Sequence, residues 1–137
     1  PITAPLFAGV YPSNYTPERH LSHKERKRLY VINTQPNHRP GEHWVAIYYG
    51  FDGSVYYFDS YGLKPHINIY RKLRKLKKIR LWPRRIQGFQ NTCGLYCLCF
   101  GLAVAGGFDL NVFGDNWMAN DRIVRRETSK RFKWRTK

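Results

Sequence analysis

The sequence predicts an α+β domain, because a pair of apolar strands joined by a tight turn lies mid-chain and two helical patterns follow it. The chain has 137 residues, of which 42% are hydrophobic, enough for one core but hardly for a second independent one. Strands in the middle of a chain with helices around them are typical of the α+β class. We therefore expect a single domain over residues 1–137.

The first half of the chain contains the expected strands. The segment Pro5–Pro12 is apolar but broken by Pro and Gly, so we expect irregular structure with short elements there. Leu29–Asn33 and His43–Tyr49 are apolar runs bounded by turn residues, which is typical of buried strands. Asp52–Gly53 supplies the positive φ that a hairpin turn needs, so Val55–Asp59 is expected to return as the strand paired with His43–Tyr49.

The second half contains the expected helices. Between Ile67 and Ile79 apolar residues recur at helical spacing, which predicts a helix that packs one face and is cationic elsewhere. The stripe consists of Ile67, Tyr70, Leu73, Leu76 and Ile79. Ile79–Trp82 is expected to form a short strand. Cys93–Ala105 is apolar nearly all round, so it is expected to be the buried central helix. A last helix is expected from Asn120 to about Ser129.

The chain is strongly basic, with 24 Lys and Arg against 9 Asp and Glu and a formal net charge of +15. Such a surplus attracts polyanions, and nucleic acid is the leading partner. After the last helix, Lys130–Lys137 is expected to form a basic tail. The residues expected to bind nucleic acid are Arg71, Lys72, Arg74, Lys75, Lys77, Lys78, Lys130 and Arg131. The alternative is that this helix only presents a solvated face.

The three cysteines, Cys93, Cys97 and Cys99, lie too close together on one helix to cross-link the fold. We therefore expect a reducing intracellular environment. A zinc site that combines these cysteines with His20 and His23 is not expected, because the Cys-x3-Cys-x-Cys pattern lacks paired knuckles.

No membrane partner is expected either. The longest apolar run, Leu95–Val104, is too short to cross a bilayer. The sequence starts at Pro1 without a basic stretch followed by an apolar core, so it shows no signal-peptide pattern.

Four residues from separate segments are suited to thiol-dependent hydrolysis. Cys93 is expected to begin the central helix, where unpaired N–H groups and the helix dipole stabilise a thiolate. His43 begins a strand and Asp59 ends the strand paired with it, so they can act as base and orienting carboxylate. Counting from the turn places position 43 roughly opposite position 62, which makes Asp59 a near neighbour. Gln87, six residues before Cys93, can donate to an oxyanion together with the backbone N–H of Cys93.

The segments around these residues resemble three signature blocks of the adenovirus proteases, or adenains. They read Gly41-Glu-His-Trp-Val-Ala-Ile47, Tyr57-Phe-Asp-Ser-Tyr-Gly62 and Gln87-Gly-Phe-Gln-Asn-Thr-Cys-Gly-Leu-Tyr-Cys97. SUMO-specific (Ulp-type) proteases share the order His, Asp, Gln, Cys and the His-Trp pair. The upstream segments Phe7–Pro12 and Val31–Thr34 also resemble adenains, which favours the viral branch, including proteases of related virus-like DNA transposons. The resemblance covers residues 7–126 and leaves 127–137 as a basic tail.

The resemblance implies an adenain/Ulp-like fold, with a central mixed sheet packed against a buried helix that starts at the nucleophile. It implies a cysteine endopeptidase with Cys93, His43 and Asp59 as the triad and Gln87 in the oxyanion hole, beside Trp44 and Gly94. Adenains often carry Glu where this chain has Asp59, a change that keeps the carboxylate.

The resemblance also implies partners and a location. Expected substrates are viral or capsid precursor polypeptides cut beside Gly, in the virion and host nucleus, by a monomer. No cofactor is required for the chemistry, and DNA is the expected activator. The disulfide-linked activating peptide of the family is not expected, because this sequence has no cysteine upstream of Cys93.

Other interpretations of the same residues stay open. Cys97 and Cys99 are expected to be inert core residues. Gln90 competes with Gln87 for the oxyanion role, and Asp59 could instead shape a turn. Trp44 is expected either beside the His43 ring or in the core. As whole-protein alternatives, the chain could process SUMO or ubiquitin-like tails, or could be a basic DNA-packaging protein with a vestigial site.

Overall fold

The computed structural model describes residues 7–11, 29–34, 43–50, 53–65, 67–73, 78–88 and 91–132. Its strands are β1 (Phe7–Tyr11), β2 (Leu29–Asn33), β3 (Trp44–Tyr49), β4 (Ser54–Phe58) and β5 (Lys78–Leu81). Its helices are α2 (Ile67–Leu73), α3 (Cys93–Val104), the 3-10 helix η2 (Leu110–Val112) and α4 (Trp117–Phe132).

The five strands form one sheet in the order of the chain, from β1 to β5. β3 pairs antiparallel with β2 and β4, whereas β1 and β5 pair parallel with their neighbours, so the sheet is mixed. The predicted hairpin of β3 and β4 is confirmed, with Ala46 opposite Phe58 and Tyr49 opposite Val55. Gly53 in its turn has a φ of +85°, the left-handed region that favours glycine.

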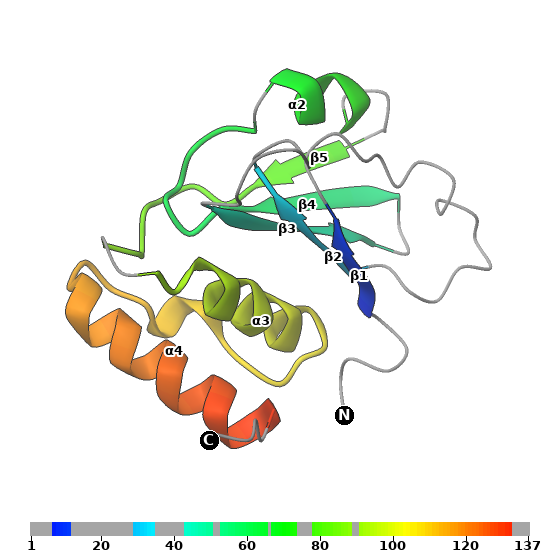
Figure 1. Cartoon of the computed structure of the whole chain (residues 1–137). Coiled ribbons are helices and arrows are strands. Elements are labelled where there is room, and N and C mark those ends of the chain that lie inside the picture. Colours follow the sequence, from blue (N-terminus) through cyan, green and yellow to red (C-terminus); the bar gives the residue numbers. More distant parts are fainter. Residues whose placement is uncertain are drawn as a thin grey trace.

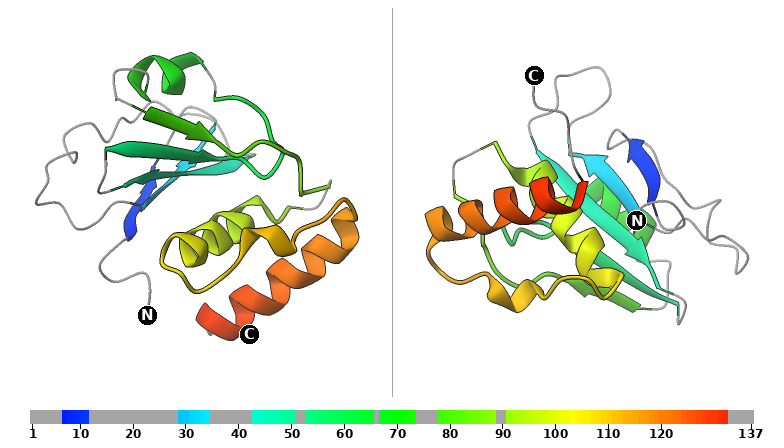
Figure 2. Two further views of the ribbon diagram at one scale, coloured as in Figure 1. Left: turned by 180° about the vertical axis from the view of Figure 1, so that it is seen from behind. Right: turned by 90° about the horizontal axis from the view of Figure 1, so that it is seen from below.

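Helices cover both faces of this sheet (Figure 1). α3 lies across one face with α4 on its outer side, and α2 lies over the other face, as the views in Figure 2 also show. Alternate strand residues therefore enter two separate cores. The first core packs Leu29, Val31, Ala46 and Phe58 with side chains of α3 and α4. The second packs Tyr30, Ile32, Val45, Ile47 and Tyr57 with Ile69 and Leu73 of α2. The predicted α+β class is confirmed.

α3 is the buried centre that its sequence predicts. It is apolar nearly all round because the sheet covers one side and α4 the other. It begins at Cys93, as predicted, and ends at Val104. Among the described residues, no helix combines the length and the apolarity that a bilayer crossing requires.

The helix expected from Ile67 to Ile79 is wrong at its end, where residues 78 and 79 belong to a strand. α2 ends at Leu73, residues 74–77 lie outside the described residues, and Ile79 pairs with Val55 in β5. The strand expected near Ile79–Trp82 is therefore confirmed one residue earlier, at Lys78–Leu81. Pairing with β4 determines this choice, and a sequence window cannot detect such a distant partner.

The expected apolar stripe of that helix is also partly wrong. Ile67 and Tyr70 are 56% and 43% exposed, whereas Ile69 and Leu73 are buried against the sheet. Only Leu73 of the three stripe residues in α2 packs as expected. Leu76 lies outside the described residues.

α4 is longer at both ends than the expected Asn120–Ser129. It starts after Asn116, whose side-chain oxygen accepts a hydrogen bond from the Ala119 N–H at 3.0 Å and so caps the helix. Lys130 and Arg131, expected in the tail, lie in its last turn, where cations favour the helix dipole. Residues 133–137 lie outside the described residues.

Candidate active site

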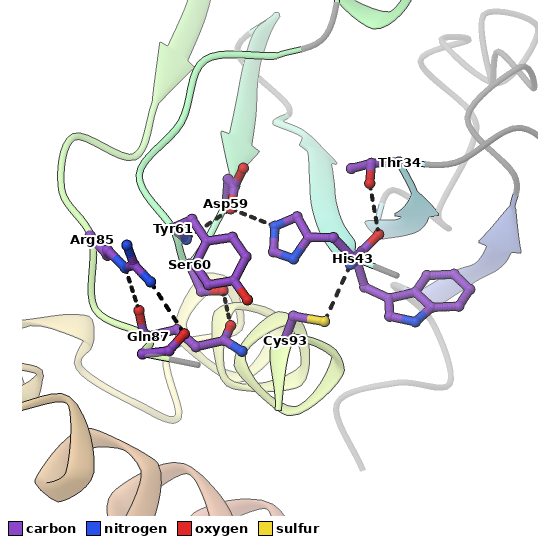
Figure 3. Close-up of polar contacts among 10 residues, drawn as sticks. Thr34, His43, Asp59, Ser60, Tyr61, Arg85, Gln87 and Cys93 are labelled. Carbon is purple, nitrogen blue, oxygen red and sulfur yellow. Dashed lines mark hydrogen bonds and ion pairs between the residues drawn. The ribbon is translucent and has the colours of Figure 1, made fainter. Parts of the chain in front are cut away.

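The start of β3, the end of β4 and the start of α3 meet at one end of the sheet (Figure 3). His43 directly precedes β3, Asp59 directly follows β4, and Cys93 is the first residue of α3. Continuing the pairing of Ala46 with Phe58 by three residues places position 43 opposite position 61, one short of the expected 62. The hairpin therefore brings His43 and Asp59 together, and the start of α3 adds Cys93, the third residue that the sequence proposes for a triad.

Asp59 holds the His43 ring. His43 Nε2 donates to Asp59 Oδ1 at 2.7 Å, and the Asp59 side chain is almost fully buried. The same oxygen accepts the Tyr61 backbone N–H at 2.8 Å. Asp59 therefore shapes the turn after β4 and orients the imidazole at once, so the two interpretations drawn from the sequence are compatible.

Two residues that the sequence interpretation did not single out fix His43 from other sides. The Thr34 backbone N–H and hydroxyl both donate to the His43 carbonyl oxygen, at 2.9 and 3.2 Å. The Tyr61 ring stacks on the imidazole, with 4.4 Å between ring centroids and 16° between planes. Tyr61 lies two residues after Asp59, within the block Tyr57–Gly62 that resembles adenains. This block is the signal that could have identified Tyr61.

The Cys93 sulfur lies among groups that favour its anion. The Trp44 backbone N–H donates to Sγ at 3.3 Å, and His43 Nδ1 points toward the sulfur (Figure 3). Burial raises the pKa of Cys93, but His43 and the N–H groups of Trp44 and Gly94 outweigh it, so the pKa is lowered. Trp44 thus acts on the site through its backbone, while its ring packs against the first core.

His43 is biased toward its protonated form. Burial lowers the pKa of His43, but the hydrogen bond with Asp59 and the interaction with Cys93 raise it by a larger amount. The pKa of His43 is therefore raised from 6.5 to about 9. A thiolate–imidazolium pair is therefore favoured at neutral pH. Burial instead raises the pKa of the thiols of Cys97, well above its usual value, and of Cys99, to about 12, as expected for core cysteines.

The first turn of α3 has no anionic or side-chain cap. Thr92 occupies the N-cap position without a side-chain hydrogen bond to the helix, and no acidic residue lies in the first turn. The N–H groups at this end are therefore not taken up by a capping side chain. The Gly94 N–H is one of these groups, and it helps to lower the pKa of the Cys93 thiol.

Gln87 is fully buried, and its side-chain amide is oriented by Ser60. The Ser60 hydroxyl donates to Gln87 Oε1, which turns the amide nitrogen to the Cys93 side (Figure 3). The Ser60 carbonyl also accepts the backbone N–H groups of Ile86 and Gln87, at 2.8 and 3.1 Å. This geometry suits an oxyanion donor. The competing Gln90 lies outside the described residues.

The segment that carries Gln87 is fixed from behind by a buried asparagine. Asn120 Nδ2 donates to the carbonyls of Ile86 at 2.9 Å and Gly114 at 2.8 Å, and its Oδ1 accepts the Gly114 N–H at 3.0 Å. No sequence pattern pointed to Asn120 because its partner Ile86 lies 34 residues away.

No family model and no curated protein match the sequence. Among solved structures, the ASFV pS273R protease aligns with a TM-score of 0.57 and 19% identity over 90% of this chain and 59% of its own. Its selenomethionine form aligns with a TM-score of 0.49 and 24% identity over 74% of this chain and 43% of its own. This chain therefore shares its fold with the ASFV pS273R protease.

This similarity spans under two thirds of the ASFV chain and, at 19% identity, shows the fold alone. A second structure, the central domain of an uncharacterized Lpg1148 protein from Legionella pneumophila, aligns with a TM-score of 0.51 and 14% identity. This alignment covers 96% of this chain and 94% of the Legionella domain.

Among the residues predicted to bind nucleic acid, those that the structure describes lie in two places. Arg71 on α2 and Lys78 on β5 are exposed over one layer, whereas Lys130 and Arg131 are exposed on α4 in the opposite layer (Figure 1). α4 adds exposed arginines that the sequence interpretation did not name: Arg122, Arg125 and Arg126. Of the other predicted residues, Arg74, Lys75 and Lys77 lie outside the described residues, as does the Lys72 side chain.

Metal binding finds no ligand set in the part of the chain that is described, where no three His, Cys, Asp or Glu side chains cluster. His20 and His23 lie outside it.

Gly94, beside the nucleophile, borders open space, because a Cβ built there would meet no atom within 4 Å. A substrate backbone can therefore approach this end of α3.

Proposed function

We propose that this chain is a cysteine endopeptidase with Cys93 as nucleophile, His43 as acid and base, Asp59 as orienting carboxylate and Gln87 as oxyanion donor. The observation that carries the proposal is the 2.7 Å His43–Asp59 hydrogen bond beside a thiol whose pKa is lowered at a helix start. These features are what an activated nucleophile requires.

In the proposed reaction, the Cys93 thiolate attacks the scissile carbonyl carbon. The resulting oxyanion accepts hydrogen bonds from the Gln87 amide and the Cys93 backbone N–H. The His43 imidazolium gives its Nδ1 proton to the leaving amine as the C–N bond breaks, which leaves a thioester on Cys93. Neutral His43 then takes a proton from water, and the hydroxide attacks the thioester. The C–S bond breaks, which releases the acid product and regenerates the Cys93 thiolate.

We propose precursor polypeptides of a virus or virus-like element, including capsid precursors, as substrates, cut at sites that contain Gly. The resemblance of the sequence blocks to adenains supports this class, and the open space beside Gly94 leaves room for a polypeptide to approach Cys93. The resemblance to adenains also supports action as a monomer in the virion and the host nucleus.

The deciding experiment incubates the protein with a peptide library containing Gly-Gly and maps the cleaved bonds. Cys93→Ala should abolish hydrolysis while the circular dichroism spectrum is kept, and Cys99→Ala, which removes a buried thiol away from the site, should retain it. Hydrolysis by Cys93→Ala at the parent rate would exclude the proposed nucleophile. Cleavage of a ubiquitin-like precursor in preference to the peptides would instead identify a SUMO-type protease.

A second measurement distinguishes the proposed endopeptidase from a DNA-packaging protein with a vestigial site. Iodoacetamide should alkylate Cys93 at neutral pH much faster than a free thiol, because more of it is thiolate. Alkylation at the free-thiol rate, with no hydrolysis, would favour the packaging protein.

DNA is proposed as a non-specific partner and activator. The formal charge of +15 supports this, as do the exposed cations of α2, β5 and α4. Concentrating enzyme and DNA-bound precursors on one polymer would speed their encounter. Adding duplex DNA should accelerate cleavage of a DNA-bound precursor more than that of a small peptide.

A further inference from the structure

The Arg85 guanidinium lies between two aromatic rings beside the site. Its central carbon is 5.0 Å from the centroid of the Tyr61 ring and 4.4 Å from that of Trp117, the first residue of α4. Tyr61 in turn stacks on His43 at 4.4 Å. A cation between two rings is attracted by both, so Arg85 supports the ring that covers the imidazole.

The same guanidinium holds the backbone at the oxyanion donor. Arg85 Nε donates to the Gln87 carbonyl at 2.7 Å, and a terminal nitrogen donates to the Gly88 carbonyl at 3.4 Å (Figure 3). The Ser60 hydroxyl fixes the Gln87 side chain, and Arg85 fixes its main chain. One side chain therefore contacts the supports of both the base and the oxyanion donor.

We propose that Arg85 is a positioning residue that holds Gln87, and through Tyr61 also His43, in register with Cys93; this rests on the proposed function. A lysine could keep the charge, but it has no plane to stack between two rings and no fixed fork of donors. Small displacements of a catalytic group cost large factors in rate, so loss of this support should be visible in turnover.

Arg84 is the matched control. It belongs to the same segment, lies 5.2 Å from the Trp82 ring centroid, and donates to the Phe113 carbonyl at 2.6 Å. These two interactions resemble those of Arg85 in kind but are made with residues outside the proposed site. Arg84→Ala therefore reports what general loosening of the segment does.

The experiment measures steady-state kinetics of a Gly-Gly peptide for Arg85→Ala, Arg85→Lys, Gln87→Ala and the Arg85→Ala/Gln87→Ala double variant. Arg85→Ala should lower kcat by about 10- to 100-fold with KM little changed. Arg85→Lys should not restore it. In the double variant the loss should be smaller than the product of the two single losses, because part of the effect of Arg85 acts through Gln87. Arg84→Ala should keep kcat within about threefold of the parent even where its melting temperature falls.

Losses that multiply in the double variant, or an equal loss of kcat in Arg84→Ala, would overturn the proposal. A parent protein that hydrolyses no peptide would refute the proposed function instead, and the positioning role is then decided by alkylation of Cys93. Iodoacetamide should react several-fold more slowly with Arg85→Ala than with Arg84→Ala, because His43 loses its stacked support. Equal alkylation rates in these two variants would overturn the positioning role by itself.

Discussion

A single carboxylate oxygen, Asp59 Oδ1, accepts hydrogen bonds from the His43 ring and from the Tyr61 backbone. The turn that this oxygen stabilises also places the Tyr61 ring against the face of the imidazole. Orientation of the base and shape of the turn are thus one arrangement. The Glu that adenains often carry here would add one methylene between the backbone and these two bonds.

The pKa of His43, about 9, predicts an alkaline limit for the proposed activity. We expect kcat/KM to fall as pH rises through about 9, because the imidazolium that pairs with the thiolate loses its proton there. The acid limit should lie below the usual range of a thiol, because the pKa of Cys93 is lowered. Asp59→Asn should move the alkaline limit toward the ordinary pKa of 6.5. A parent alkaline limit already near that value would contradict the assignment.

The same pKa shift has a consequence for stability. Because the pKa of His43 is raised on folding from 6.5, its contribution is fully present below that pH and is lost as pH rises through about 9. The lowered pKa of Cys93 acts in the opposite sense, because its thiolate adds stability as pH rises toward the ordinary thiol pKa of 9.0. The two contributions oppose each other between pH 6.5 and about 9, so the denaturation midpoint of the parent should change little there. A steep fall of the midpoint over this interval would indicate that Cys93 stays protonated.

Ser60→Ala should lower kcat by about tenfold with KM little changed, because the Gln87 amide loses the hydroxyl that orients it. Ser54→Ala is the control, since Ser54 is equally buried but lies at the far end of β4. Steady-state kinetics of both variants give the comparison. Unchanged kcat in Ser60→Ala would show that the amide needs no such support.

At the scale of elements, the turn after β4 approaches the segment before α3 so closely that only glycine fits. A Cβ on Gly62 would lie 2.5 Å from the Arg84 carbonyl carbon, at a φ of +70°. Gly53 has a similar φ of +85°, but a Cβ there would meet no atom within 4 Å.

Gly62→Ala should therefore destabilise the protein by at least about 2 kcal/mol, and Gly53→Ala by about 1 kcal/mol. Because the Arg84 backbone leads to Gln87, Gly62→Ala should also lower kcat in the fraction that stays folded. Chemical denaturation and kinetics of the pair test this. Equal destabilisation by both substitutions would mean that the backbone at Arg84 moves away from the added Cβ at no measurable free-energy cost.

The elements that the sequence predicts well are those with local signals. Asp52–Gly53 determines the hairpin, and the apolar run after Thr92 determines α3. The helix expected up to Ile79 fails because strand pairing with Val55 outweighs helical spacing there. Asn116, which caps α4, lies earlier than the apolar pattern alone indicates.

In the candidate site, the blocks shared with adenains predict the residues that the structure brings together. The residues that support them are not predictable in the same way. Thr34, Tyr61 and Asn120 act on partners in other segments, and such contacts leave no pattern in a sequence window.

For the molecule as a whole, the surplus of cations predicts binding to duplex DNA through phosphates rather than bases. Replacing Arg71, Lys78, Lys130 and Arg131 by Gln should flatten the log–log dependence of affinity on salt, by about 0.9 for each phosphate that is no longer neutralised. Peptide hydrolysis without DNA should be unchanged. Fluorescence anisotropy of a labelled duplex across a salt series measures the slope. A slope unaffected by the four substitutions would make these residues a solvated surface only.

The hydrogen bond from the Trp44 N–H to the Cys93 sulfur joins positions that are 49 residues apart in the chain. The hairpin of β3 and β4 can form from neighbouring residues, but this bond requires α3 to dock beside β3. During synthesis, His43 and Asp59 leave the ribosome long before Cys93. Until the helix docks, the cysteine is an ordinary thiol that is mostly protonated at neutral pH. A partly unfolded chain therefore lacks the activated cysteine, because the groups that lower the thiol pKa surround it only once α3 has docked.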